Sequence, residues 1–212
     1  MRNMQTEQYI NLEKRFDSLK QVFLNDPLSP TGDYEDHVFE KTNAYKVLTH
    51  AEIEYYFEQS CLSIAKKAFK NWENTGKSSK CIVALVSYYS GNRLTYPSSL
   101  SGSVNFHGVE DYVKDAFTEY SRYVNSENHG IKEKNIYQLC LPIGINIAEI
   151  SGELLSAASS YGTERGGIAH TTGRIIRRVT PDEAMETTDN ILQHIKEFDS
   201  MICSINDELD TT

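Results

Sequence analysis

Apolar residues recur at steps of three and four along much of this chain, a spacing that predicts amphipathic helices. The first stripe predicts a helix that ends near Asn25, and a loop follows it over residues 26–36. A second, longer helix is predicted over residues 43–72. The apolar positions of the first helix are Leu12, Phe16, Leu19 and Phe23. Those of the second are Val47, Ile53, Phe57, Cys61, Ile64 and Ala68.

The middle of the chain contains one ambiguous segment between clearer ones. The run CIVALVSYYS (81–90) is apolar on all sides, which fits either a buried helix or a central strand. We favour a helix, because no partner strands are evident nearby. Residues 90–105 are rich in serine, glycine and proline and predict an exposed loop. Residues 109–124 return to helical spacing.

Two further helices are predicted after a short element at residues 135–141. Asn146 is placed to cap the first of them, and its apolar face would be Ile147, Ile150, Leu154, Ala158 and Tyr161. Thr180, Pro181 and Glu183 form a capping-box sequence that starts the last helix. The apolar face of that helix continues through Ala184, Thr188, Ile191, Ile195, Phe198, Ile202, Ile205 and Leu209.

These elements together predict an all-α helical bundle with a long C-terminal helix. The chain shows no internal repeat and no linker that would divide it. We therefore expect residues 1–212 to form one domain, with a core at about 43–205 and an N-terminal helix and loop at 1–42.

Composition and charge narrow the possible functions. Charged residues make up 24% of the 212 residues and the net charge is −9, which argues against non-specific binding of nucleic acid by the whole surface. No apolar run approaches the ~20 residues of a membrane span, and the first residues lack the apolar region of a signal peptide. We therefore expect a cytoplasmic protein. The four cysteines lie far apart and predict buried free thiols, not a metal site.

A local basic segment interrupts this acidic chain. Residues 165–178 contain Arg165, Arg174, Arg177, Arg178 and one histidine, His170, but no acid. An arginine can grip phosphate oxygens with its planar donors, and a histidine can transfer a proton near neutral pH. The pair would suffice for metal-free RNA cleavage, in which the ribose 2′-OH attacks the adjacent phosphorus. Two alternatives remain: the arginines pair with surface carboxylates, and His170 is structural.

The spacing of Arg165 and His170 adds a geometric constraint. Five residues along an ideal helix rotate by about 500°, so the two positions would lie about 140° apart. Either Gly166 and Gly167 loosen the backbone, or the two residues flank a groove that something else completes. A second copy packed antiparallel would bring both pairs to one cleft, and a two-fold dimer is the commonest oligomer.

The segment ERGGIAH (164–170), near the end of an all-α chain, resembles the HEPN motif, an arginine and a histidine separated by four to six residues. The match is nearest to the branch of the RiboL-PSP and MAE types. HAEIEYYFE (50–58) is similar to the long second helix of that branch, and the resemblance covers about residues 43–205. It implies a dimeric, metal-independent endoribonuclease without a cofactor, with Arg165 and His170 at the dimer interface.

The resemblance also implies partners. They are an RNA substrate, a second copy of the chain and a possible antitoxin or anti-phage defence protein, with no membrane and no DNA. Two positions depart from the family pattern. Gly166 replaces a frequent polar residue, and Thr172 replaces the tyrosine that is modified in some HEPN toxins. Some members have lost catalysis and serve as modules that dimerise or bind nucleotide or RNA.

Three further residues are candidates for supporting roles. Glu54 and His50 lie one turn apart at the edge of the predicted core face, where either could orient Arg165 or His170. Glu164 directly precedes Arg165. An ordinary solvated acid is an equal alternative for both glutamates. Three functions stay open at this point: a ribonuclease, a non-catalytic HEPN module, and an all-α interaction protein unrelated to HEPN.

Overall fold

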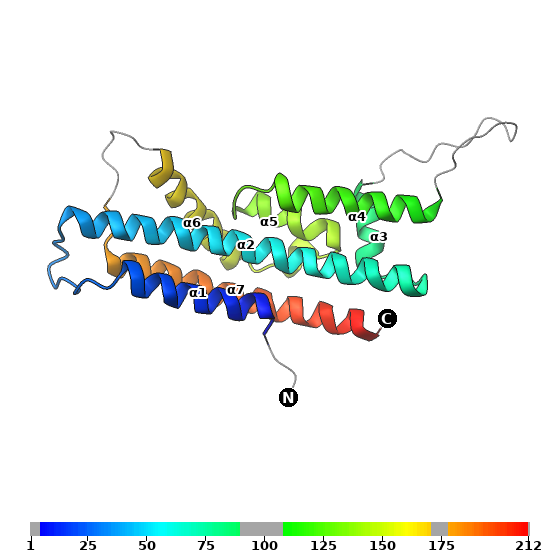
Figure 1. Cartoon of the computed structure of the whole chain (residues 1–212), viewed down its shortest axis with the longest axis horizontal. Coiled ribbons are helices and arrows are strands. Elements are labelled where there is room, and N and C mark those ends of the chain that lie inside the picture. Colours follow the sequence, from blue (N-terminus) through cyan, green and yellow to red (C-terminus); the bar gives the residue numbers. More distant parts are fainter. Residues whose placement is uncertain (1–4, 90–107, 171–177, 212) are drawn as a thin grey trace, which may run out of the picture.

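Seven α-helices and two short 3-10 segments make up most of the described part of the chain, which is residues 5–89, 108–170 and 178–211 of a computed structural model (Figure 1). No strand occurs in these ranges. The α-helices are α1 (Glu7–Phe23), α2 (Asp36–Thr75), α3 (Lys80–Tyr89), α4 (Val109–Ser126), α5 (Glu133–Cys140), α6 (Gly152–His170) and α7 (Pro181–Thr211). The 3-10 segments are η1 (Leu141–Ile143) and η2 (Ile147–Glu149). The all-α prediction is confirmed, and residues 81–89 are helical.

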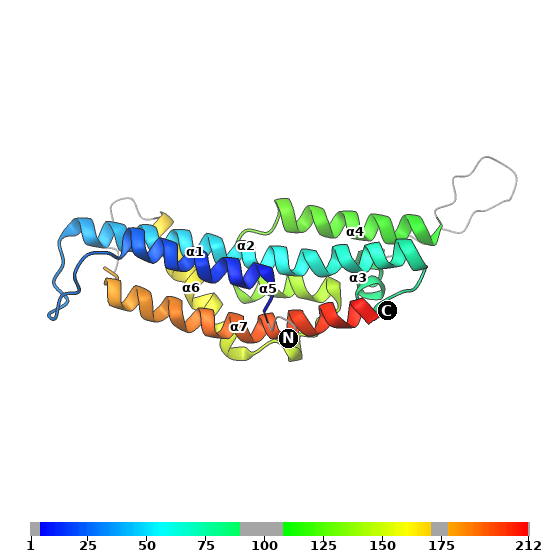
Figure 2. The same ribbon diagram turned by 60° about the horizontal axis from the view of Figure 1, so that its bottom comes forward.

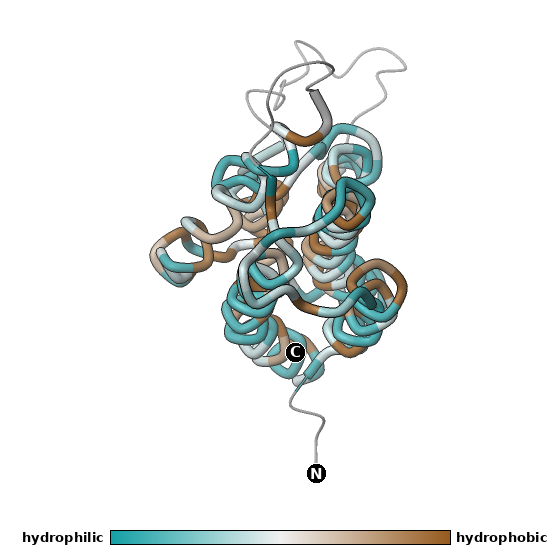
Figure 3. Tube along the Cα trace, turned by 90° about the vertical axis from the view of Figure 1, so that its left-hand side faces the viewer, coloured by the Kyte–Doolittle hydropathy of each residue, from teal (hydrophilic) through white to brown (hydrophobic). Residues whose placement is uncertain are grey.

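Helix α2 is the centre of the bundle, because all six other α-helices contact it. Helices α1 and α7 run beside it, whereas α3, α4 and α5 gather near its C-terminal half (Figures 1 and 2). Seen end-on, the coils lie side by side around a shared interior (Figure 3). The buried face of α2 includes Ile53, Phe57, Cys61, Ile64 and Ala68, as predicted.

The start of α2 differs from its predicted position. The helix begins at Asp36, seven residues before the predicted start at 43. Val38 and Thr42 already belong to its buried face, and the Thr42 hydroxyl donates to the Val38 carbonyl at 2.9 Å. The first part of α2 is rich in polar residues, so a prediction based on the spacing of apolar side chains did not detect it. At the other end, Gly76 adopts a left-handed conformation (φ 69°) that closes the helix.

Asn146 is the second difference. Its side chain accepts a hydrogen bond from the Ala148 amide at 3.1 Å and caps η2, not α6. Helix α6 starts only at Gly152. The hydroxyl of the preceding residue, Ser151, accepts a hydrogen bond from the Leu154 amide at 3.2 Å. Ile147 is consequently 38% exposed, while the remaining predicted apolar positions of this helix are buried.

Helix α7 starts and packs as the sequence predicts. The Thr180 amide donates to the Glu183 carboxylate at 3.2 Å, and the Glu183 amide donates to the Thr180 hydroxyl at 3.3 Å. Its apolar face lies on the core apart from Ile205, which is half-buried. Three of the free cysteines are buried and Cys203 is half-buried. The predicted loop at 90–105 falls outside the described residues. Nowhere in the described ranges is a helix long and apolar enough to cross a bilayer.

A buried carboxylate joins the start of α1 to the middle of α7. Asp199 has no exposed surface. Its oxygens accept hydrogen bonds from the Thr6 amide at 2.8 Å, the Thr6 hydroxyl at 2.5 Å and the Tyr56 hydroxyl at 2.9 Å. Thr6 in turn caps α1 by accepting from the Tyr9 amide at 3.1 Å. One side chain therefore ties α1, α2 and α7 together.

Replacement of Asp199 by alanine should lower the free energy of unfolding by about 3 kcal/mol, because it leaves several buried donors without an acceptor. Urea denaturation of both proteins measures the difference. Asp210→Ala is the matched control on the same helix, since Asp210 is exposed and pairs only with Lys67 at 2.8 Å among the described contacts; its effect should stay below about 1 kcal/mol. Equal effects of the two substitutions would contradict the prediction.

Candidate functional site

The predicted motif lies on the C-terminal half of α6. The helix continues without a break through His170, its last residue, so Gly166 and Gly167 do not open the backbone. Positions 165 and 170 consequently lie on different faces of α6, about 140° apart. The side chain of His170 and residues 171–177, with Arg174 and Arg177, lie outside the described part of the structure. The arrangement of Arg165 and its neighbours is described.

Arg165 is half-buried, and its Nε has no hydrogen-bond partner among the described residues. The positive charge of Arg165 acts on His50 of α2. His50 is only 3% exposed, and its Nδ1 is likewise without a described hydrogen-bond partner. Its Nε2 lies 3.7 Å from the point that a Cβ on Gly162 would occupy, so α6 passes closely over this imidazole. Of the predicted residues, His50 therefore packs against α6 about one turn before Arg165.

His50 is held in its neutral form. Burial, and then the positive charge of Arg165, lower the pKa of His50 to about 4. Glu54 sits one turn further along α2, and its Oε2 lies 3.7 Å from His50 Nδ1, which is beyond hydrogen-bond length. An uncharged ring therefore packs beside the guanidinium-bearing turn of α6.

Glu164 is bound by a lysine of α2. Its Oε2 accepts from Lys46 Nζ at 2.5 Å, and Lys46 Nζ also donates to the Thr187 hydroxyl of α7 at 3.0 Å. Lys46 is fully buried, with 0% exposure. Sequence reasoning missed Lys46, although there was a signal: it lies seven residues before Ile53 and four before His50, on the face of α2 that was predicted to be buried.

Arg178 forms an exposed ion pair. Its Nη2 lies 2.9 Å from Asp36 Oδ1 at the start of α2, and its guanidinium lies 5.0 Å from the centre of the Phe39 ring. For this arginine, the structure shows the pairing with a carboxylate that was the alternative interpretation of the basic segment.

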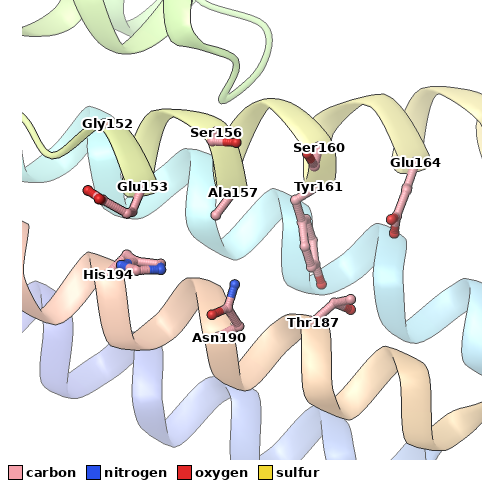
Figure 4. A pocket seen from close by; sticks show the side chains of 10 residues that line it. All are labelled: Gly152, Glu153, Ser156, Ala157, Ser160, Tyr161, Glu164, Thr187, Asn190 and His194. Carbon is pink, nitrogen blue, oxygen red and sulfur yellow. The ribbon is translucent and has the colours of Figure 1, made fainter.

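A groove of about 550 Å³ lies between α6 and α7 next to this site. Figure 4 shows α6 side chains opposite Thr187, Asn190 and His194 of α7. The groove exists because α6 presents small residues there; its α6 side is Gly152, Glu153, Ser156, Ala157, Ser160, Tyr161 and Glu164. Across the described ranges, no three His, Cys, Asp or Glu side chains come together as metal ligands would.

The low pKa of His50 has a measurable consequence. Between the usual histidine value of about 6.5 and the folded value of about 4, the unfolded chain binds a proton that the folded chain excludes. Stability from neutral His50 is therefore complete above about pH 6.5 and is lost as the pH falls toward 4. An NMR titration of the His50 Cε1–H signal, assigned by its absence in His50→Gln, should give a midpoint near 4. A midpoint at or above 6 would contradict this environment.

The chain matches one known family over almost its whole length. The family model described as RiboL-PSP-HEPN matches residues 10–204, which confirms the resemblance seen in ERGGIAH and extends it across α1. No curated protein and no solved structure matched the chain. The family match spans most of α1 to α7 and includes the turn that carries Arg165. The chain therefore belongs to the RiboL-PSP-HEPN family of all-α HEPN domains.

Proposed function

We propose that this HEPN protein is a metal-independent endoribonuclease in which Arg165 contacts the scissile phosphate and His170 transfers a proton. The observation that carries the proposal is the state of Arg165. The Nε of its guanidinium is buried without a described hydrogen-bond partner, and no described carboxylate forms an ion pair with the guanidinium. A permanently charged, uncompensated guanidinium is suited to bind a phosphate.

The charges around Arg165 support this role. Glu164, its neighbour in the sequence, is bound by Lys46 and does not neutralise it. His50, on which the charge of Arg165 acts, is neutral at working pH. Glu54 lies beside His50, with its Oε2 3.7 Å from His50 Nδ1, and is an acidic group next to that ring. In an acidic chain, these arrangements leave a local positive charge at the motif.

The reaction follows from the chemistry of the two groups. The ribose 2′-oxygen attacks the adjacent phosphorus, the bond to the 5′-oxygen breaks, and a 2′,3′-cyclic phosphate remains on one product. His170 moves a proton to or from these oxygens, and Arg165 stabilises the extra negative charge of the transition state. Neither step calls for a metal ion or a cofactor.

A homodimer would complete the site. Positions 165 and 170 lie on different faces of one helix, so one α6 does not readily place both groups on the same phosphate. Two α6 helices related by a two-fold axis would supply Arg165 and His170 from both copies. We further propose a cytoplasmic role as a toxin or anti-phage effector, held in check by a partner protein.

Removal of either motif residue should abolish cleavage. We expect Arg165→Ala and His170→Ala to lower the rate of cutting of single-stranded RNA at least 100-fold, because each removes a transition-state interaction. EDTA should have no effect, and a strand with 2′-deoxyribose at the cut site should stay intact. Arg122→Ala is the control, since Arg122 pairs with Glu119 and Glu127 on exposed α4.

The outcomes separate the candidate functions. RNA binding by the wild type without any cutting would support the non-catalytic module instead. No binding and no cutting would support a role in protein interaction. Cleavage that survives in both variants would remove the motif from the mechanism.

Mixing the two inactive variants tests the composite site. A dimer with one Arg165→Ala chain and one His170→Ala chain retains one arginine and one histidine. We expect such mixtures to regain part of the wild-type rate if both copies contribute to one cleft. Activity that stays at the level of the separate variants, despite proven subunit exchange, would show that each chain works alone.

A further inference from the structure

The half of α6 that carries the motif has little apolar attachment to the bundle. Over residues 152–168, where burial is described, the buried apolar residues of α6 are Leu154, Leu155, Ala158 and Tyr161, all in its first ten positions. From Thr163 to Ile168 every residue is half-buried or exposed. Something other than hydrophobic burial must therefore hold the turn that contains Arg165.

Lys46 provides that attachment. Its ammonium group donates to Glu164 of α6 and to Thr187 of α7, and it lies 4.3 Å from the centre of the Tyr161 ring. We call these four residues the Lys46 cluster. Because Lys46 has no exposed surface, its charge has lost water and depends on these partners. The contact is thus unlike the exposed ion pairs of the surface, which contribute little.

A second set of bonds fixes the same three helices. The Tyr161 hydroxyl lies 2.5 Å from the Thr49 hydroxyl of α2 and 3.0 Å from the Thr188 hydroxyl of α7. Thr49 and Lys46 are three residues apart on α2, and Thr187 and Thr188 are adjacent on α7. Together these bonds fix the rotation of α6 about its own axis relative to α2 and α7.

The rotation of α6 determines the direction in which the Arg165 side chain leaves the helix. Neighbouring residues of a helix differ by about 100° in direction. Arg165 directly follows Glu164, so the bonds from Lys46 to Glu164 and Thr187 also fix the backbone turn that carries Arg165, whose charge acts on His50. A rotation or loosening of this turn would move the guanidinium by several ångströms. Errors of about 1 Å can lower catalytic rates ~100-fold.

We propose that Lys46 is a positioning residue: by binding Glu164 and Thr187, it holds the last turns of α6 so that Arg165 meets the scissile phosphate. The inference deepens the proposed ribonuclease function and rests on it. Lys46 does not touch RNA in this scheme, since it is buried among α2, α6 and α7.

Hydrogen exchange tests the structural half of this proposal without any substrate. In Lys46→Met, which keeps the length of the side chain but not its charge, we expect the amides of residues 162–168 to exchange at least ~10-fold faster. The amides of residues 154–158 should change little. Lys67→Met is the matched control on α2, because Lys67 donates to the Asn206 carbonyl of α7 at 2.7 Å far from the motif. An unchanged pattern in α6 would overturn the proposal.

Kinetics test the functional half. We expect Lys46→Met to lower kcat at least ~10-fold while KM for single-stranded RNA stays within about twofold, and Lys67→Met to keep the wild-type kcat. Glu164→Gln, which can still accept from Lys46, should retain more activity than Glu164→Ala. Equal kcat values for Lys46→Met and Lys67→Met would overturn the positioning role.

A second variant and a measurement that needs no RNA cleavage keep the test decisive. If Lys46→Met does not fold, Thr187→Val removes one partner of the ammonium without unpairing a buried charge, and the same exchange and rate changes should appear in weaker form. If the wild type cuts no RNA, the ribonuclease proposal fails. Hydrogen exchange then still shows whether Lys46 holds the last turns of α6.

Discussion

The packing of six helices against α2 is the constraint on which the rest of this structure depends. A helix of 40 residues that is contacted by every other α-helix of the described chain has a long buried face, on which a polar side chain cannot reach water. Polar groups on its buried faces must therefore find partners in the neighbouring helices. Those partners, more than the apolar contacts, determine how each neighbour is oriented.

Two buried polar clusters show this effect at different places in the bundle. Asp199 joins the start of α1, the middle of α2 and the middle of α7, whereas Lys46 joins α2 to α6 and the start of α7. Apolar surfaces tolerate small sliding and rotation, because their attraction has no direction. A buried charge with two or three fixed partners does not, since displacement leaves it desolvated and unpaired. The bundle is filled by its apolar residues and aligned by these two.

The same pairing of charges bears on the cationic site that we propose at Arg165. Two carboxylates of this part of the chain bind other cations: Glu164 binds Lys46, and Asp36 binds Arg178. The charge of Arg165 acts on His50, which burial keeps neutral. The site therefore depends on where acids are held, not on an excess of bases, and net charge alone would not reveal it.

The sequence by itself determined the helical class, the capping box of α7, the buried faces of α2 and α7, and the motif that marks Arg165 and His170. These are local features, because helical period, caps and motif spacing are written within a few turns of chain. It did not determine the early start of α2 at Asp36, the use of Asn146 in η2 or the partners of Glu164 and Arg178. Only the tertiary structure decided those, since Lys46 and Glu164 are 118 residues apart and meet through the packing of α6 on α2.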